Sequence, residues 1–504
     1  MYPPAIGTMH MRSRAVPPPS VRCFPEYLRE AGWYCTNDGF TDYQFATPVT
    51  VWDENGAEAH WRNRPDESPF FAVFNAGAAH ESQIYADDEQ FLRNTSLLTP
   101  DQRHDPALAP LPPYYPDTQP MREAWARYSD NVTAVDHWAG AIIDELEADG
   151  LADSTLVVFW SDHGRGMPRA KRWPYEAGLH VPLLARWPGR IAPATVRSEL
   201  VSLMDLGPTM LAAAGLSVPS QMHGRALFDS AARFEASPRD VVHGHSDRMT
   251  SAPDTIRTVR DARFRYIRNF RPDRPYLQHQ DYCEGFSTWQ ELRRLQYKET
   301  IVRELGARPD ELTPAQRAFL AESKPAEELY DVAGDPHEIR NLAAEPAYAN
   351  ELERLRRELT AWQELLGDLG LIDEAELIEQ WRPRGVTPVT QPPGVTVTGG
   401  KAAARCATEG ASIAWTRDAP RPDLPKLPSA AEAAAAVVGE IAVDDALRYA
   451  TIALWCGIPP DDGRRWHLYA GPVDLEPQTT VWFRACRLGY LDSADVSVTG
   501  EGDR

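Results

Sequence analysis

Short apolar runs alternate with amphipathic stretches over the first 240 positions of the chain. The runs at 70–75, 155–160 and 181–186 are almost entirely apolar, which predicts buried strands. Apolar residues recur at helical spacing over 121–150 and 202–215, and a glycine ends each stretch, which predicts two helices. Strands and helices joined by short links are typical of an α/β sandwich with a mostly parallel sheet.

The pattern changes after about residue 240. Apolar and polar positions alternate over 255–270, which predicts an antiparallel hairpin, and 286–322 and 349–381 have the pattern of charged amphipathic helices. A proline-rich stretch then precedes a segment of short β-like runs. We therefore expect four parts: an α/β domain over 1–238, a smaller α+β subdomain over 239–381, a linker over 382–395 and a β-sandwich over 396–504.

The composition argues against two classes of binding partner, nucleic acids and membranes. The chain has 73 acidic and 52 basic residues and a formal net charge of −21, and a surface that acidic repels the phosphate backbone of nucleic acid. No apolar run approaches the ~18–20 residues of a membrane span. The six cysteines include no CxxC pair, which argues against a disulfide scaffold and a zinc knuckle. We predict neither a nucleic-acid nor a membrane partner, and the oligomeric state stays open.

The first candidate site residues follow the predicted strand at 155–160. Asp162 and His163 stand at its end, and Gly164 allows the chain to turn sharply. A carboxylate and an imidazole can supply an oxygen and a nitrogen to a divalent cation. The alternative is a capping aspartate beside a surface histidine.

Two further candidates could bind an anion. Lys171, nine positions after Asp162, would place a positive charge beside a tetrahedral group that develops negative charge. His80 follows the strand at 70–75 and could be an anion ligand or a general acid. Taken alone, each is more readily explained as an ordinary polar loop residue. Because strand ends meet at one edge of a parallel sheet, we predict that His80, Asp162, His163 and Lys171 share one cleft.

Five stretches carry a family resemblance. They are 2–7 (YPPAIG), 70–80, 162–176 with the pattern D-[HN]-G-x₆-K-x₃-Y-E, 201–209 (VSLMDLGPT) and 328–342 (ELYDVAGDPHEIRNL). Together they resemble the sulfatases of the alkaline-phosphatase superfamily, and the likeness covers about residues 1–365. The residues at 247–249 and 265–270 look most like bacterial sulfatases related to heparan N-sulfatase.

The resemblance implies an alkaline-phosphatase-like α/β/α sandwich and a calcium site at which a formylglycine attacks the sulfur of a sulfate ester. Carried over by position, Asp162 and His163 would be metal ligands, and His80 and Lys171 would hold or protonate the sulfate group. The implied activity is hydrolysis of the sulfate esters or N-sulfates of sulfated carbohydrates. A phosphodiester or phosphonate hydrolase of the same superfamily, and a non-catalytic glycan-binding relative, stay open as alternatives.

The chain departs from the family in two places. The C-x-P-x-R signature, whose cysteine becomes formylglycine, should precede Tyr2 directly, and none of the six cysteines offers it; the paired aspartates of the first strand are missing too. We therefore expect an N-terminally truncated chain, inactive as printed, with the formylglycine and any export signal upstream of Met1, so that a periplasmic or extracellular location stays open. In the G-K-x-H segment, Phe40 and Asp42 replace the lysine and histidine.

The end of the chain resembles a second family. The stretches 406–416, 468–472 and 484–490 look like a chitobiase C-terminal-type β-sandwich. Such modules often accompany carbohydrate-active enzymes. Glycan binding and a purely structural role are both open for this segment.

Overall fold

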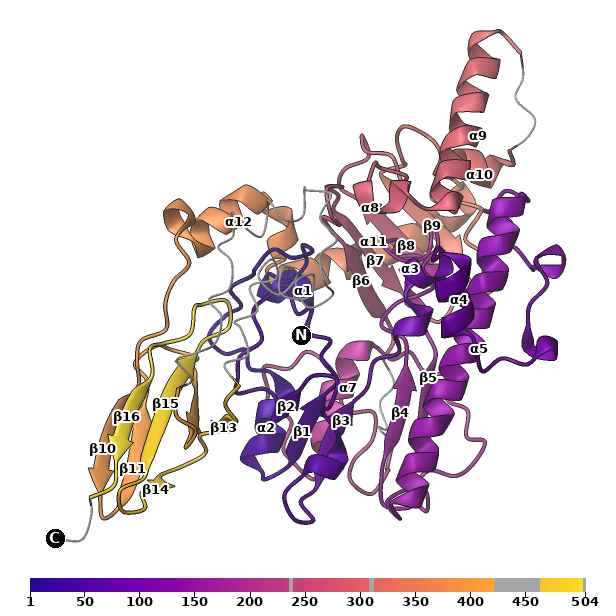
Figure 1. The fold of residues 1–504 in the computed structure, drawn as a ribbon. Coiled ribbons are helices and arrows are strands. Elements are labelled where there is room, and N and C mark those ends of the chain that lie inside the picture. The colour runs from indigo at the N-terminus through magenta and orange to yellow at the C-terminus, as the bar shows by residue number, and fades with distance from the viewer. Residues whose placement is uncertain (235–238, 308–311, 421–462, 502–504) are drawn as a thin grey trace. The chain divides into compact units, whose positions relative to one another are not determined.

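The computed structural model describes residues 1–234, 239–307, 312–420 and 463–501 (Figure 1). The chain forms two compact units. The first consists of Met1–Asn75, Met204–Ser230 and Asp368–Arg504, and the second consists of Ala76–Leu203 and Ala231–Gly367. Within the described ranges, no helix has both the length and the apolar character that crossing a membrane requires.

The first unit contains a small parallel sheet. β1 (Tyr34–Asn37) pairs in parallel with β2 (Glu54–Asn55) on one side and with β3 (Phe70–Val73) on the other. Helices α2 (Phe24–Glu30) and α7 (Leu206–Ala213) share an apolar core with these strands. β3 and α7 confirm a predicted strand and a predicted helix. The other α-helices described in this unit are α1 (Pro3–Ile6) and α12 (Glu374–Trp381).

Two antiparallel sheets form a β-sandwich near the end of the chain. Their strand orders are β10-β11-β14 and β13-β12-β15-β16. The strands are β10 (Gly394–Thr398), β11 (Lys401–Arg405), β12 (Ser412–Thr416), β13 (His467–Leu468), β14 (Val473–Asp474), β15 (Thr480–Cys486) and β16 (Val496–Thr499). Ala402, Ile413 and Phe483 belong to one apolar core that both sheets share. Residues 421–462 of the predicted sandwich lie outside the described residues.

The sandwich makes contacts with the N-terminal segment of the same unit. Leu488 lies in a buried cluster with Ile6 and Val21, and an Nη2 of Arg487 donates a 2.6 Å hydrogen bond to the carbonyl of Pro17. These contacts join the two ends of the chain within one unit. The predicted linker and domain boundaries stay predictions.

The second unit contains the long helix α5 (Gln119–Ala148), which confirms the helix predicted there. Pro120 stands in its first turn, where a missing N–H is not needed for the helix. The chain leaves the helix through Gly150, whose φ of 69° favours glycine. Met121 and Ala124 face the main apolar core of this unit.

β4 (Val157–Trp160) and β5 (Leu183–Arg186) confirm the positions of the other two predicted strands, but they pair antiparallel and are not buried as predicted, since Leu184 is 59% exposed. The link between them contains only the one-turn helix α6 (Glu176–Leu179). A parallel pair needs a longer crossover connection, usually a helix that spans the sheet. Among the described residues, the predicted parallel pairing therefore holds for β2-β1-β3 and not for β4-β5.

A four-stranded antiparallel sheet completes the second unit. Its strands, in order, are β6 (Val242–Ser246), β7 (Ile256–Arg260), β8 (Phe264–Asn269) and β9 (Glu327–Asp331). α11 (Ala349–Leu366) covers one face, where Trp362 stacks on His243 with ring centroids 4.7 Å apart. α6 lies on the opposite face, where Leu179 contacts β6 at Gly244. β7 and β8 confirm the predicted hairpin.

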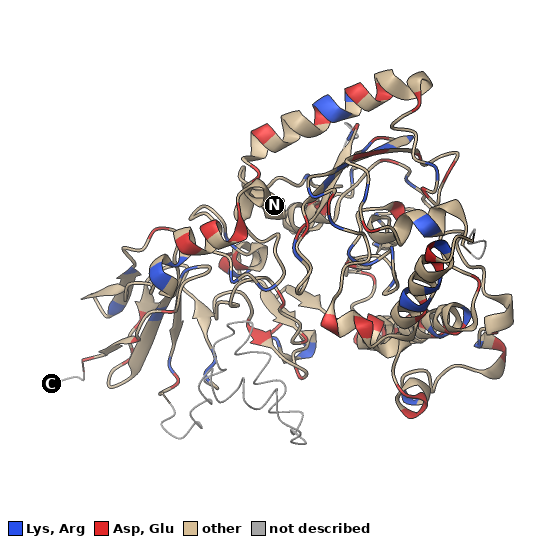
Figure 2. Cartoon of the chain, turned by 90° about the horizontal axis from the view of Figure 1, so that it is seen from above, with Lys and Arg blue, Asp and Glu red and all other residues tan. Residues whose placement is uncertain are grey.

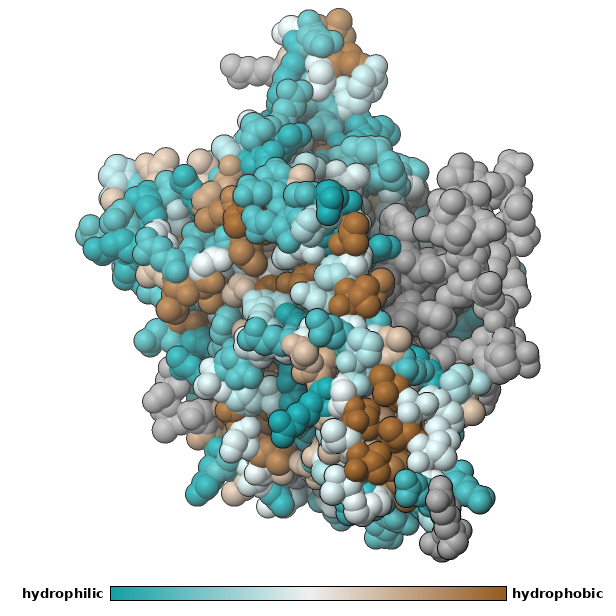
Figure 3. Space-filling view, turned by 90° about the vertical axis from the view of Figure 1, so that its left-hand side faces the viewer, coloured by the Kyte–Doolittle hydropathy of each residue, from teal (hydrophilic) through white to brown (hydrophobic). Residues whose placement is uncertain are grey.

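The remaining α-helices of the second unit are mostly short. They are α3 (Glu81–Ile84), α4 (Asp88–Asn94), α8 (Asp281–Glu284), α9 (Ser287–Glu304) and α10 (Pro314–Phe319). α9 and α10 lie in the helical range predicted at 286–322, of which 308–311 are outside the description. Acidic and basic residues are interspersed along the helices (Figure 2), and exposed apolar residues form separate patches on a largely hydrophilic surface (Figure 3).

Candidate active site

The loop after β4 places the first candidate residues. The hydroxyl of Ser161 donates to the carbonyl of His163 at 2.6 Å, which tightens the turn. The N–H of Gly164 donates to the carbonyl of Gly178 at 2.9 Å, so the loop is tied to α6. A Cβ at Gly164 would lie 1.8 Å from the carbonyl oxygen of Ala177, so the backbones can approach this closely only at a glycine.

Asp162 and His163 present ligand atoms at this turn. The side chain of Asp162 is 70% exposed, and one of its oxygens lies 3.4 Å from Nε2 of His163. Nδ1 of His163 lies 2.7 Å from the carbonyl oxygen of Gly164. Because a carbonyl oxygen only accepts, Nδ1 carries the ring proton and donates this hydrogen bond, and Nε2 keeps its lone pair. Loss of hydration lowers the pKa of His163, and the charge of Lys171 lowers it further against the opposing effect of Asp162. The neutral ring can therefore bind a cation through Nε2.

His80 caps the N-terminus of α3. Its Nδ1 accepts a 3.4 Å hydrogen bond from the N–H of Ser82 and lies 2.8 Å from the hydroxyl of the same residue. An Nδ1 that accepts places the ring proton on Nε2. Loss of hydration lowers the pKa of His80, and the charge of Lys171 adds to this effect. His80 thus presents a neutral N–H donor.

A buried carboxylate joins the His80 segment to the loop after β4. Glu81 is 1% exposed, and Arg172 binds it through both guanidinium nitrogens, one at 2.9 Å. Nζ of Lys171 lies 3.5 Å from the same carboxylate. Burial alone would raise the pKa of Glu81, but the hydrogen bonds and charge of Arg172 outweigh it and hold the pKa below its usual value. Glu81 therefore stays ionised and orients both cations.

The structure brings the four candidate residues into electrostatic contact within the second unit. The charges of Lys171, His163 and Asp162 all act on the ring of His80. Sequence reasoning did not find Glu81, which follows His80 directly, or Arg172, which follows Lys171. The only hint in the sequence was that each of these residues stands directly beside a candidate, as His80-Glu81 and Lys171-Arg172.

The donor set at this site is small for a calcium ion. Calcium takes six to eight oxygen ligands. Among residues that the structure describes, no group of three or more His, Cys, Asp or Glu side chains is gathered for a metal. Asp162 and His163 fit as two ligands by their exposure and tautomer, and the described residues do not make a complete calcium site.

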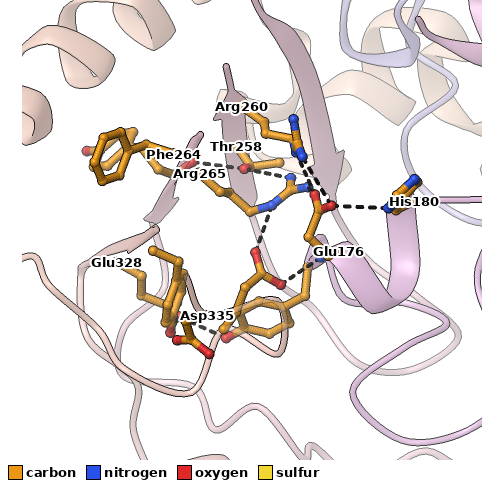
Figure 4. A network of polar contacts seen from close by, with 12 residues as sticks. Glu176, His180, Thr258, Arg260, Phe264, Arg265, Glu328 and Asp335 are labelled. Carbon is orange, nitrogen blue, oxygen red and sulfur yellow. Dashed lines mark hydrogen bonds and ion pairs between the residues drawn. The ribbon is translucent and has the colours of Figure 1, made fainter. Parts of the chain in front are cut away.

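A second polar network fixes the end of the loop (Figure 4). Tyr175 donates a 2.8 Å hydrogen bond to Glu328 of β9, and the N–H of Glu176 donates a 2.7 Å hydrogen bond to Glu338. The Glu176 carboxylate binds Arg265 of β8, as well as Arg260 of β7 at 2.8 Å. The Tyr-Glu pair and the ELYD segment therefore support the site through contacts with the antiparallel sheet.

The two glutamates Glu176 and Glu338 of this network have pKa values shifted in opposite directions. Burial would raise the pKa of Glu176, but the hydrogen bond of His180 and the charges of Arg265 and Arg260 hold it well below its usual range. Burial raises the pKa of Glu338 to about 7, although the charge of Arg265 opposes the shift. The two carboxylates thus contribute opposite signs to the pH dependence of stability.

Comparison with known proteins shows the family. The family model described as Sulfatase matches residues 5–216, and the model for the C-terminal part of N-sulphoglucosamine sulphohydrolase matches residues 168–278. An ulvan-active sulfatase of Formosa agariphila is 34% identical over 99% of this chain and 81% of its own length. Human N-sulphoglucosamine sulphohydrolase is 30% identical over 52% of each chain.

The chain belongs to the sulfatase family. It is a sulfuric ester hydrolase, and the match to N-sulphoglucosamine sulphohydrolase confirms the predicted resemblance to heparan N-sulfatase. A solved putative sulfatase from Bacteroides thetaiotaomicron has a TM-score of 0.46 at 18% identity, covering 73% of this chain and 80% of its own. A phosphonate monoester hydrolase from Silicibacter pomeroyi has the same score and identity, covering 81% and 88%. Likenesses at this level carry no argument about function.

Proposed function

We propose that this sulfatase acts on sulfated carbohydrates and that His80, Lys171, Asp162 and His163 form the site for the sulfate group. The observation that carries the proposal is the position of Lys171, which Glu81 holds beside the neutral ring of His80. Two relatives support the substrate class, since one is named as active on ulvan and the other on N-sulphoglucosamine.

The two anion-binding residues have different tasks. The ammonium of Lys171 places positive charge where negative charge develops during transfer of the sulfuryl group. Nε2 of His80 donates a hydrogen bond to a sulfate oxygen. A neutral imidazole is a poor proton donor, so of the two roles predicted for His80, holding the sulfate group is favoured over protonating the leaving group.

Asp162 and His163 would hold a divalent cation, which the family resemblance identifies as calcium. When bound, that cation would supply positive charge to the sulfate oxygens. The family resemblance also implies a formylglycine nucleophile, and the printed chain contains no C-x-P-x-R or S-x-P-x-R stretch that would form it. The site residues are therefore tested by binding.

The test is calorimetric titration with sulfated oligosaccharides prepared from ulvan, with the desulfated oligosaccharides as a reference. Lys171→Ala should lower the affinity for the sulfated form about 10-fold or more, the scale of a lost charge-assisted hydrogen bond. Lys401→Ala is the matched control, because Lys401 is an exposed lysine of the β-sandwich that pairs with Asp474. Unchanged affinity in Lys171→Ala would refute the assigned role.

The same titration separates the alternatives. Tighter binding of phenylphosphonate than of phenyl sulfate would favour a phosphonate hydrolase of the same superfamily. Equal binding of sulfated and desulfated oligosaccharides would favour a glycan-binding protein without a sulfate site.

A further inference from the structure

We propose that Tyr282 of α8 is a specificity-determining residue that stacks on the sugar ring carrying the sulfate group. This inference rests on the proposed function, because it assigns the carbohydrate part of the substrate to a surface beside the sulfate site.

α8 lies next to the residues that hold His80. The ring of Tyr282 packs on Phe286, and Phe286 stacks on Tyr85, which directly follows α3, the helix that His80 caps. The charges of Glu81 and Arg172 also act on Tyr282, so the ring lies beside the cluster that orients Lys171. Tyr282 therefore borders the sulfate site on the side of His80.

The ring of Tyr282 is both exposed and braced. It is 43% exposed, so one part of the ring is open to solvent. Phe286 meets it edge to face with ring centroids 5.0 Å apart, and Phe286 in turn stacks on Tyr85 at 4.2 Å. The hydroxyl of Tyr85 lies 2.6 Å from that of Thr288, which is fully buried. Tyr85 and Phe286 pack against each other, and Tyr282 at the end of this series of aromatic rings is exposed to solvent.

This arrangement suits a sugar ring. A pyranose has an apolar face of C–H groups that packs on an aromatic ring, while its hydroxyls point outward. A tyrosine offers a rigid amphipathic contact area at a small cost in conformational entropy. The neighbouring carboxylate of Asp281 lies 2.7 Å from Nε2 of His279 and is 89% exposed. Tyr282 itself is a neutral phenol and does not repel the sulfate group.

The test compares two variants of Tyr282 in the full chain with inorganic sulfate and with sulfated oligosaccharides prepared from ulvan. Tyr282→Ala should weaken binding of the oligosaccharide about 10-fold, on the scale of one aromatic contact, and should leave the affinity for inorganic sulfate within about 2-fold. Tyr282→Phe keeps the ring, so its affinity for each of the two ligands should stay within about 3-fold of that of the unchanged chain. Tyr297→Ala is the matched control, because Tyr297 on α9 is 69% exposed.

Two outcomes would overturn the inference. If Tyr282→Ala binds the oligosaccharide as tightly as the unchanged chain, the ring makes no contact with sugar. If it loses inorganic sulfate to the same extent as oligosaccharide, Tyr282 acts on His80 through the packing of α3 and not on the sugar. An unchanged chain that binds sulfated and desulfated oligosaccharides equally refutes the proposed function instead, and the inference falls with it.

Discussion

Nζ of Lys171 lies 3.5 Å from the carboxylate of Glu81. This contact joins the loop after β4 to the segment that follows His80, two stretches some ninety positions apart in the chain. Because Glu81 is buried and also bound to Arg172, the position of Lys171 depends on a carboxylate that solvent does not reach. The site is thus assembled by an ion pair inside the second unit.

Gly166→Ala should displace Glu81 and destabilise the site. A Cβ at Gly166 would lie 2.2 Å from the Cβ of Glu81, so one of the two segments must move. We expect a loss of about 1–3 kcal/mol in the free energy of unfolding, measured by urea denaturation. Gly140→Ala on α5 is the control: nothing lies within 4 Å of its added Cβ, and alanine is the better helix former. Equal effects at the two positions would contradict the close packing at Glu81.

His80 should act as a hydrogen-bond donor rather than as a cation. His80→Ala should lower the affinity for inorganic sulfate about 10-fold, and His80→Gln, which keeps an N–H donor, should retain part of it. Because the pKa of His80 is lowered from 6.5, its ring should stay neutral at neutral pH. Calorimetric affinity should therefore show no His80-dependent change between about pH 7 and pH 8. If the affinity for sulfate instead rose as the pH fell through 7, and His80→Gln abolished that rise, the ring of His80 would be cationic in the complex.

Glu338 should make stability fall as the pH rises. Its pKa is about 7 in the folded chain against an ordinary value of 4.5, so between these values the folded state binds more protons than the unfolded state. The contribution is fully favourable below pH 4.5 and is lost by about pH 7. Glu338→Gln cannot ionise, so its free energy of unfolding should lack this decline. The free energies of unfolding are measured by urea denaturation at several pH values across this range. If they change with pH in the same way for Glu338→Gln and for the unchanged chain, the raised pKa of Glu338 is contradicted.

Calcium should bind weakly to the printed chain. Asp162 and His163 provide two ligands, so we expect a Kd on the order of 1 mM, at the weak end of protein calcium sites. Asp162→Asn should abolish the calorimetric signal, and Asp88→Asn should preserve it, since Asp88 is 93% exposed and pairs with Arg127. Tight binding that survives Asp162→Asn would place the calcium site elsewhere.

Much of the fold follows from local pattern. The strands β3, β4 and β5 appear in the sequence as continuous apolar runs, although their residues are only partly buried or exposed in the structure. Helix α5 appears because its apolar stripe has helical spacing. The antiparallel pairing of β4 with β5 was not predictable, because an apolar run does not record the direction of the neighbouring strand.

The candidate site was predictable only in part. His80, Asp162, His163 and Lys171 follow strands and match a family pattern, whereas Glu81 is visible only once the chain is folded. The role of Glu81 depends on contacts with Lys171 and Arg172, which lie some ninety positions further along the chain. A local sequence pattern does not indicate contacts between residues so far apart in sequence. The same holds for Tyr282, which Phe286 links to Tyr85 although the two tyrosines are far apart in sequence.

The most direct test of the sulfate site is a crystal structure of the chain with a sulfated ulvan oligosaccharide. The account predicts that one sulfate group lies within hydrogen-bond distance of Nζ of Lys171 and Nε2 of His80, between 2.7 and 3.2 Å for N–H···O contacts. A sulfate group bound elsewhere, with Lys171 still paired to Glu81 and no ligand atom near His80, would contradict it.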